Sequence, residues 1–202
     1  MMTGKIFYLL SIFLIIFSGV CCKQNMPNIN KTDTTTSSVF WGDSTLAKEN
    51  YFKTVASEHG SSILKKQNNL YLKKYSDYNS TDSKSTNLNA ISVQLLKQSS
   101  SSSKEFKVNF FTYDNGKKID SLDFYRNISG DGFGEYNCLS YFDQKNNRLW
   151  QIKYFPSKGK DPSYIISYSK SSITSDGKIE QDSLYYLDES LEEEMDKYNL
   201  YY

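Results

Sequence analysis

Carboxylates are the side chains of this sequence with the clearest chemical potential. Asp120 and Asp123 fall in one expected strand, and Asp131 and Glu135 border a glycine-rich turn. A glycosidase needs two carboxyl groups on either side of the bond that it cleaves, so a pair among these four acids would suit hydrolysis. Acids near turns ordinarily act as turn formers and solvated side chains. A hydrolase is therefore the alternative interpretation rather than the leading one.

Other catalytic or metal-binding patterns are weak. His59 is the single histidine and is expected at the end of a helix, where the helix dipole favours a cation. Cys138 is the single cysteine after residue 22, and we expect a small buried residue on a strand, so a Cys/His zinc site lacks ligands. Residues 130–134 read GDGFG, but the expected strand after them does not fit a dinucleotide site, which needs a helix there. We expect no metal and no cofactor, and the sequence favours a protein that is not an enzyme.

Aromatic residues are plentiful and predict a binding surface. The chain has 17 tyrosines and 12 phenylalanines, and aromatics occur on both faces of the expected strands. One face must form the core, and the other would expose tyrosine and tryptophan, which suit a protein or glycan partner because they combine contact area with a hydrogen-bonding tip. The candidate binding surface consists of Trp150, Tyr154, Tyr164 and Tyr168. The alternative is that helices cover both faces and bury these side chains.

The elements that would hold these residues begin with a helix. Apolar residues at helical spacing predict it over about residues 44–58, with Gly60 as its stop. Residues 69–75, which read NLYLKKY, would suit a strand. Residues 189–200 again have helical spacing and predict a short amphipathic helix that lies on the sheet.

Between these segments the pattern changes to a period of two. The expected strands cover residues 88–97, 106–111, 119–125, 136–142, 149–155, 164–169 and 178–187. Short turns such as Asp114-Asn115-Gly116 join successive strands, so antiparallel pairing is expected. The predicted fold class is α+β, with an N-terminal helix, an antiparallel β-meander of six to eight strands and a short C-terminal helix. A small barrel is the alternative.

Length and charge limit the class of protein further. The 202 residues fit one domain, and a formal net charge of +1, from 24 basic and 23 acidic residues, gives no reason to expect a nucleic-acid partner. Residues 39–202 are expected to form a single globular domain. The polar residues 23–38 predict a flexible spacer before it.

The first 22 residues predict export. A lysine precedes an apolar run over residues 6–17, which is too short to cross a bilayer comfortably but fits the central region of a signal peptide. An uncleaved anchor helix is the alternative. Small residues, Cys21 and Cys22 follow, and in this respect the leader resembles that of a bacterial lipoprotein. The resemblance implies that Cys21 or Cys22 is lipidated and becomes the mature N-terminus.

Together these features predict an exported protein of the cell envelope, anchored in a membrane through an N-terminal lipid. A secreted protein is the alternative. The leading interpretation of function is a non-enzymatic binding or interaction module, for example an accessory or immunity-type protein that occludes a partner. The alternatives are an exported hydrolase that uses the acids named above and a carrier of an apolar ligand.

Overall fold

The structure is a computed structural model that describes residues 39–76, 91–98, 104–157 and 161–201. The expected leader (1–22) and spacer (23–38) lie outside these ranges, and so do Cys21 and Cys22. Among the described helices, none has the length and apolar character that a membrane crossing requires.

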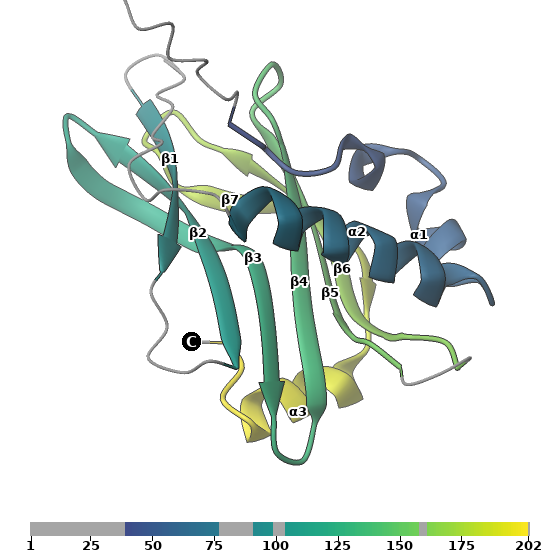
Figure 1. The fold of residues 1–202 in the computed structure, drawn as a ribbon. Coiled ribbons are helices and arrows are strands. Elements are labelled where there is room, and N and C mark those ends of the chain that lie inside the picture. The colour runs from purple at the N-terminus through teal and green to yellow at the C-terminus, as the bar shows by residue number, and fades with distance from the viewer. Residues whose placement is uncertain (1–38, 77–90, 99–103, 158–160, 202) are drawn as a thin grey trace, which may run out of the picture. The chain divides into compact units, whose positions relative to one another are not determined.

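An antiparallel sheet of seven strands dominates the fold (Figure 1). Its strands are β1 (Ile91–Gln98), β2 (Glu105–Asp114), β3 (Lys117–Gly130), β4 (Gly134–Asp143), β5 (Arg148–Phe155), β6 (Tyr164–Ile173) and β7 (Ile179–Leu187). Each strand pairs with the next one along the chain, so the spatial order is β1 to β7. The predicted meander of six to eight strands is confirmed. The Asn115-Gly116 turn has positive φ at both residues (48° and 79°), as a tight hairpin turn requires.

The helices differ from the prediction in two places. They are the 3-10 helix η1 (Ser44–Ala47) and the α-helices α1 (Tyr51–Val55), α2 (Gly60–Ser76) and α3 (Glu189–Lys197). The continuous helix predicted over 44–58 is instead a 3-10 turn, a break and a five-residue helix. Gly60 begins α2 rather than ending a helix, and a Cβ on Gly60 would stand 1.7 Å from the Val55 carbonyl oxygen. The short C-terminal helix is confirmed as α3.

The longest helix, α2, lies across one face of the sheet (Figure 1). It includes residues 69–75, so the strand predicted there was wrong. Its buried residues Leu64, Tyr71 and Tyr75 recur at helical spacing. Both tyrosine rings pack against Tyr125 of β3, with ring centroids 5.5 and 5.8 Å away. These contacts belong to the main hydrophobic core.

The C-terminal helix α3 covers a second, smaller core. Met195 of α3 and Leu200 beyond it pack with Tyr136, Phe155 and Ile166 of the sheet. Asp188 caps the N-terminus of the helix, because its carboxylate accepts hydrogen bonds from the backbone N–H groups of Ser190 and Leu191. Figure 1 shows α3 close to the β3–β4 turn.

Residues 39–42, which we call the N-terminal strap, lie against β4. The backbone N–H of Phe142 donates to the carbonyl oxygen of Trp41 at 2.9 Å. Gly42 has a φ of 89°, and a Cβ built on it would stand 2.1 Å from the Ser140 carbonyl oxygen, so the position requires glycine. Strand β3 pairs with β4 over residues 125–130 and 134–139. The strap therefore lies against the later part of β4, which β3 leaves unpaired.

The β6–β7 turn reaches back to the first strands. The Thr112 hydroxyl of β2 donates to the Gly177 carbonyl oxygen at 2.5 Å. The Ile179 N–H donates to the Asp120 carboxylate of β3 at 2.9 Å. The described strands nevertheless keep an open order with no pairing between β1 and β7. The sheet is therefore open, with its β6–β7 turn in contact with β2 and β3, and is not a closed barrel.

Candidate functional site

The structure places the four candidate acids in different settings. Asp120 accepts the Ile179 N–H and so holds the β6–β7 turn against β3. Asp131 has a fully exposed side chain that lies 3.7 Å from the ammonium of Lys104. Asp120 thus has a structural role, and Asp131 is a solvated turn residue.

Asp123 belongs to a charged network on the face of the sheet that carries α3. Its Oδ1 lies 2.9 Å from Lys107 Nζ, and its Oδ2 lies 3.5 Å from Arg126 Nη1. The Arg126 side chain is 3% exposed, lies 2.7 Å from Glu105, and donates to the carbonyl oxygen of Leu200. Since two cations already surround Asp123, we assign it the role of a structural counter-ion.

Glu135, near the start of β4, has polar neutral partners instead. Its Oε1 accepts hydrogen bonds from Asn127 Nδ2 at 2.7 Å and Asn137 Nδ2 at 3.2 Å. The sheet register sets this up, because Asn127 and Asn137 are direct cross-strand partners and Glu135 lies two residues along the same face. In the described part of the chain, Glu135 forms no ion pair.

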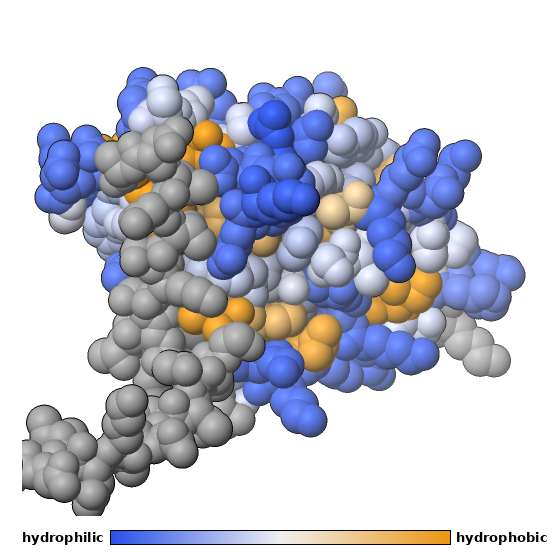
Figure 2. All heavy atoms as spheres, turned by 90° about the horizontal axis from the view of Figure 1, so that it is seen from above, coloured by the Kyte–Doolittle hydropathy of each residue, from blue (hydrophilic) through white to orange (hydrophobic). Residues whose placement is uncertain are grey.

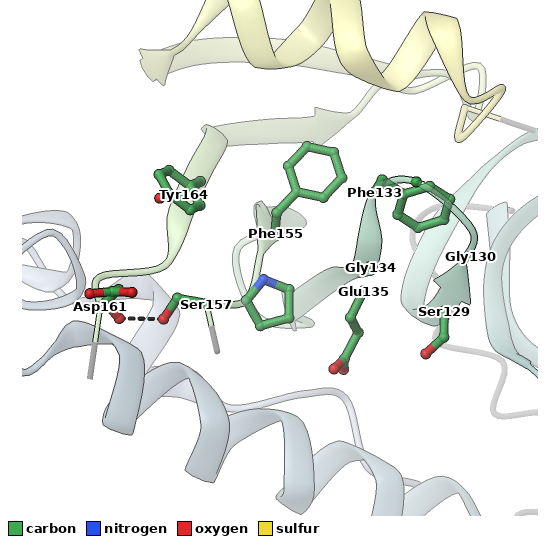
Figure 3. A pocket seen from close by; sticks show the side chains of 11 residues that line it. Ser129, Gly130, Phe133, Gly134, Glu135, Phe155, Ser157, Asp161 and Tyr164 are labelled. Atoms are coloured by element: carbon green, nitrogen blue, oxygen red, sulfur yellow. Dashed lines mark hydrogen bonds between the residues drawn. The ribbon is translucent and has the colours of Figure 1, made fainter. Parts of the chain in front are cut away.

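Glu135 also lies between two neighbouring hollows. The first, of about 680 Å³, lies between the β3–β4 turn and residues 155–157, Asp161 and Tyr164. The second, of about 470 Å³, lies between the first half of α2 and strands β4 and β5. Glu135, Pro156 and Ser157 line both hollows, which we together call the Glu135 groove. Figure 3 shows the first hollow, with Glu135 pointing toward α2 and with Phe155 pointing toward α3.

Hydroxyl and amide groups line much of the groove. The polar neutral lining residues include Ser61, Ser62, Asn69, Asn137, Ser157 and Ser163. The charged residues of the described lining are Glu135, Asp161 and Lys65. Ser61 links the two sides of the groove, because its hydroxyl donates to the Asp161 carbonyl oxygen and accepts from the Ser163 hydroxyl, both at 3.0 Å.

Two of the predicted binding aromatics are buried. Tyr154 is 1% exposed and Tyr168 is 5% exposed. Their hydroxyls donate to the carbonyl oxygens of Leu64 in α2 and Leu46 in η1, at 3.3 and 2.5 Å. Burial raises the pKa of both phenols, that of Tyr168 to about 12. Helices therefore cover both side chains on that face of the sheet, and Tyr154 also lines the second hollow of the Glu135 groove.

The other two predicted aromatics have different surroundings. Trp150 is half-buried and packs beside Tyr141, with ring centroids 5.9 Å apart. Tyr164 is 56% exposed and lines the first hollow of the Glu135 groove. Of the four predicted aromatics, the exposed Tyr164 and the buried Tyr154 thus line the candidate site.

The described residues include few groups that could bind a metal ion or act as a nucleophile. They contain no group of three or more His, Cys, Asp or Glu side chains placed to hold a metal ion. Cys138 is buried on β4, as predicted, and burial raises the pKa of its thiol to about 12, which disfavours the reactive thiolate. His59 lies in the turn before α2, exposed, with its Nε2 3.4 Å from Glu58.

A third hollow lies apart from the groove, between η1, α1 and α2. It has a volume of about 390 Å³, and its lining includes Tyr51, Ile63 and Lys66. Gln67 is hydrogen-bonded there, since its Oε1 accepts from the Tyr51 hydroxyl at 2.8 Å and its Nε2 donates to Asp43 and Thr45.

Figure 2 shows the molecule from above the view of Figure 1. Hydrophobic residues on this face form small patches separated by hydrophilic residues. The visible part of this face therefore favours a polar contact over a broad apolar one.

Sequence reasoning identified Glu135 and Tyr164 but missed the wall that α2 supplies. Ser61, Lys65 and Asn69 were overlooked because no helix was predicted over residues 60–76. Asn127 was also missed, although a signal for it exists. A hairpin folded about residues 131–133 places Asn127 opposite Asn137.

No protein-family model matches the sequence, and comparisons with curated proteins and with solved structures find no match.

Proposed function

We propose that this protein is an exported, lipid-anchored component of the cell envelope whose folded domain is a non-enzymatic binding module. The leader, with Cys21 and Cys22 at its end, and the polar residues 23–38 support export and anchoring. The Glu135 groove supports binding.

The observation that carries the binding role is the setting of Glu135. Its half-buried carboxylate is held by two amides between two hollows, with no ion pair in the described part of the chain. Partial burial of a charge without a counter-ion is unfavourable unless hydrogen-bond donors compensate. A ligand that brings N–H or O–H groups into the groove would supply those donors.

A hydrolase is less well supported by the same geometry. Asp120 and Asp123 are engaged in structural contacts away from the groove, so the acids do not converge on one bond. Asp161 is the acid that shares the first hollow with Glu135, and its side chain is exposed. A catalytic acid and base need positions fixed by the protein on either side of a substrate.

The test uses the full chain, purified in detergent and immobilised, to capture material from an envelope extract. We expect Glu135→Gln to reduce the captured material at least about tenfold, because a hydrogen bond to a charged group contributes about 1.5–3 kcal/mol. Glutamine can still accept from Asn127 and Asn137 through its Oε1, so the fold is retained.

Glu180→Gln is the matched control, since it makes the same chemical change at an exposed position of β7. Equal capture by all three proteins contradicts a binding role for the groove. Breakdown of the captured material that stops with both Glu135→Gln and Asp161→Asn would show a hydrolase instead.

Anchoring is tested separately by intact mass. The mature protein from native membranes should carry a diacyl-sized increment at its N-terminus that is lost in a variant with Cys21→Ala and Cys22→Ala. An unlipidated, cleaved N-terminus would show a secreted protein, and the role of the groove would be unaffected.

A further inference from the structure

We infer that the Glu135 groove binds a neutral oligosaccharide, with one sugar ring against Tyr164 and sugar hydroxyls on the Glu135 carboxylate. This assignment rests on the binding role proposed above and names the ligand class for that site.

The charge of the groove disfavours phosphorylated or strongly acidic ligands. Nucleic acids and other polyanions are bound by rows of lysine and arginine. Lys65 is the single cation in the described lining, and Glu135 and Asp161 oppose it. The ligand that fits is neutral and rich in hydrogen-bonding groups.

The polar lining matches hydroxyl groups. A serine hydroxyl can donate and accept, and an asparagine amide offers both functions on one side chain. Ser62 and Asn69 of α2 line the second hollow together with Ser157 and Pro156. The hydrogen bonds of Glu135 within the described structure use Oε1, so Oε2 is left to accept from sugar hydroxyls.

Tyr164 supplies the apolar part of the recognition. A pyranose ring has a C–H face as well as a rim of hydroxyls, and an aromatic side chain pairs apolar area with a polar tip. Tyr164 is 56% exposed beside the first hollow. Figure 3 shows Tyr164 and Glu135 among the side chains around this hollow.

The length of the groove favours more than one sugar unit. Two hollows of about 680 and 470 Å³ share Glu135, Pro156 and Ser157. Each volume is in the range of a small-molecule pocket. An elongated ligand could therefore place successive rings in the two hollows while it contacts Glu135 between them.

The test is an array of neutral oligosaccharides built from hexoses and N-acetylhexosamines, in increasing lengths from the disaccharide, probed with the full chain in detergent. The best binder is then titrated by calorimetry. We expect Glu135→Gln to weaken binding about ten- to hundredfold and Tyr164→Ala to weaken it about three- to tenfold.

Tyr185→Ala is the control for Tyr164→Ala, because Tyr185 is similarly exposed but lies on β7. Affinity that increases from the disaccharide to longer oligomers supports occupation of both hollows. Absence of binding to every neutral oligosaccharide at millimolar concentration, or affinity that neither variant changes, overturns the assignment.

A second measurement separates this inference from the proposed function. Envelope material captured in a Glu135-dependent way is treated with periodate, which cleaves vicinal diols, or with a protease. Loss of capture after periodate supports the saccharide. Loss after protease alone would keep the binding role of the groove and identify its ligand as a peptide or protein, so the saccharide assignment would be wrong.

Discussion

Gly42 and Ser140 touch so closely that a Cβ on Gly42 would stand 2.1 Å from the Ser140 carbonyl oxygen. The two residues belong to segments far apart in the sequence, the N-terminal strap and β4. Their contact fixes the strap beside the part of β4 that β3 does not cover.

Gly42→Ala is therefore expected to destabilise the protein by about 2–4 kcal/mol, through both its positive φ and the clash with Ser140. Gly116→Ala is the control, because Gly116 also has a positive φ but a Cβ on it would have nothing within 4 Å. It should cost about 1 kcal/mol. Equal midpoints for the two variants in urea unfolding would contradict the close contact.

Tyr71→Phe tests the hydrogen bonds next to the strap. The Tyr71 hydroxyl accepts from the Asp43 N–H and donates to the Ser140 carbonyl oxygen, each at 2.8 Å. Removal of the hydroxyl leaves both backbone groups without that partner, so we expect the free energy of unfolding to fall by about 1–3 kcal/mol. Tyr164→Phe, at an exposed position, should change the unfolding free energy by less than about 0.5 kcal/mol. A comparable loss in both variants would argue against this role of Tyr71.

Arg126→Met tests the charged network beneath α3. The variant leaves Glu105, Asp123 and the Leu200 carbonyl oxygen without their guanidinium partner. The free energy of unfolding should therefore fall by about 3–5 kcal/mol. Arg148→Met removes a more exposed ion pair with Asp182 and should cost less than about 1 kcal/mol. Chemical denaturation of the two variants side by side measures the difference.

Asp123→Asn separates a structural acid from a functional one. We expect lower stability, by about 1–3 kcal/mol, because Lys107 and Arg126 lose a charged partner. Binding to the groove ligand should be unchanged at a temperature where the variant is folded. A Kd altered as strongly as by Glu135→Gln would show that Asp123 acts in recognition.

Cys138 is expected to resist alkylation in the folded protein. Burial raises the pKa of its thiol from 9.0 to about 12, so near pH 8 the folded state should react roughly a thousandfold more slowly than the unfolded state. A chain with Cys21→Ala and Cys22→Ala keeps Cys138 as its single thiol, and iodoacetamide labelling with and without guanidinium measures the ratio. Similar rates in both conditions would show that the thiol is accessible.

The raised pKa of the Cys138 thiol also makes the free energy of unfolding fall as the pH rises. Between pH 9.0 and about 12 the unfolded thiol loses its proton while the folded thiol keeps it. The contribution of Cys138 is therefore complete below pH 9 and is lost as pH rises toward 12. Tyr168, raised from 10.0 to about 12, acts in the same direction, so alkaline unfolding is expected.

The strands and their order were predictable because their signals are local. Alternation with period two and turn sequences such as Asp114-Asn115-Gly116 belong to neighbouring residues, and each hairpin determines its own register. The residues 69–75 were misread because a short run with Leu70, Tyr71 and Leu72 fits a strand as well as a helix. The structure shows that the side chains of this segment that pack against the sheet, from Leu64 to Tyr75, recur at helical spacing.

The candidate site was predictable in part for the same reason. Glu135 stood out as an acid near a turn, and Tyr164 as an aromatic on a strand. Alternation could not reveal which aromatics are covered, because burial of Tyr154 and Tyr168 depends on α2 and η1, which lie far away in sequence. That Glu135 and residues of α2 line one hollow likewise depends on the tertiary structure.

The N-terminal strap has a consequence for the order in which the chain folds. The strap is synthesised before β4, and neighbouring contacts such as the Tyr168 hydroxyl with the Leu46 carbonyl oxygen close a separation of 122 residues. Hairpins between successive strands close much shorter loops and so lose less chain entropy. The hairpins are therefore expected to form first, and the earliest part of the domain to leave the ribosome would be the last to reach its final position.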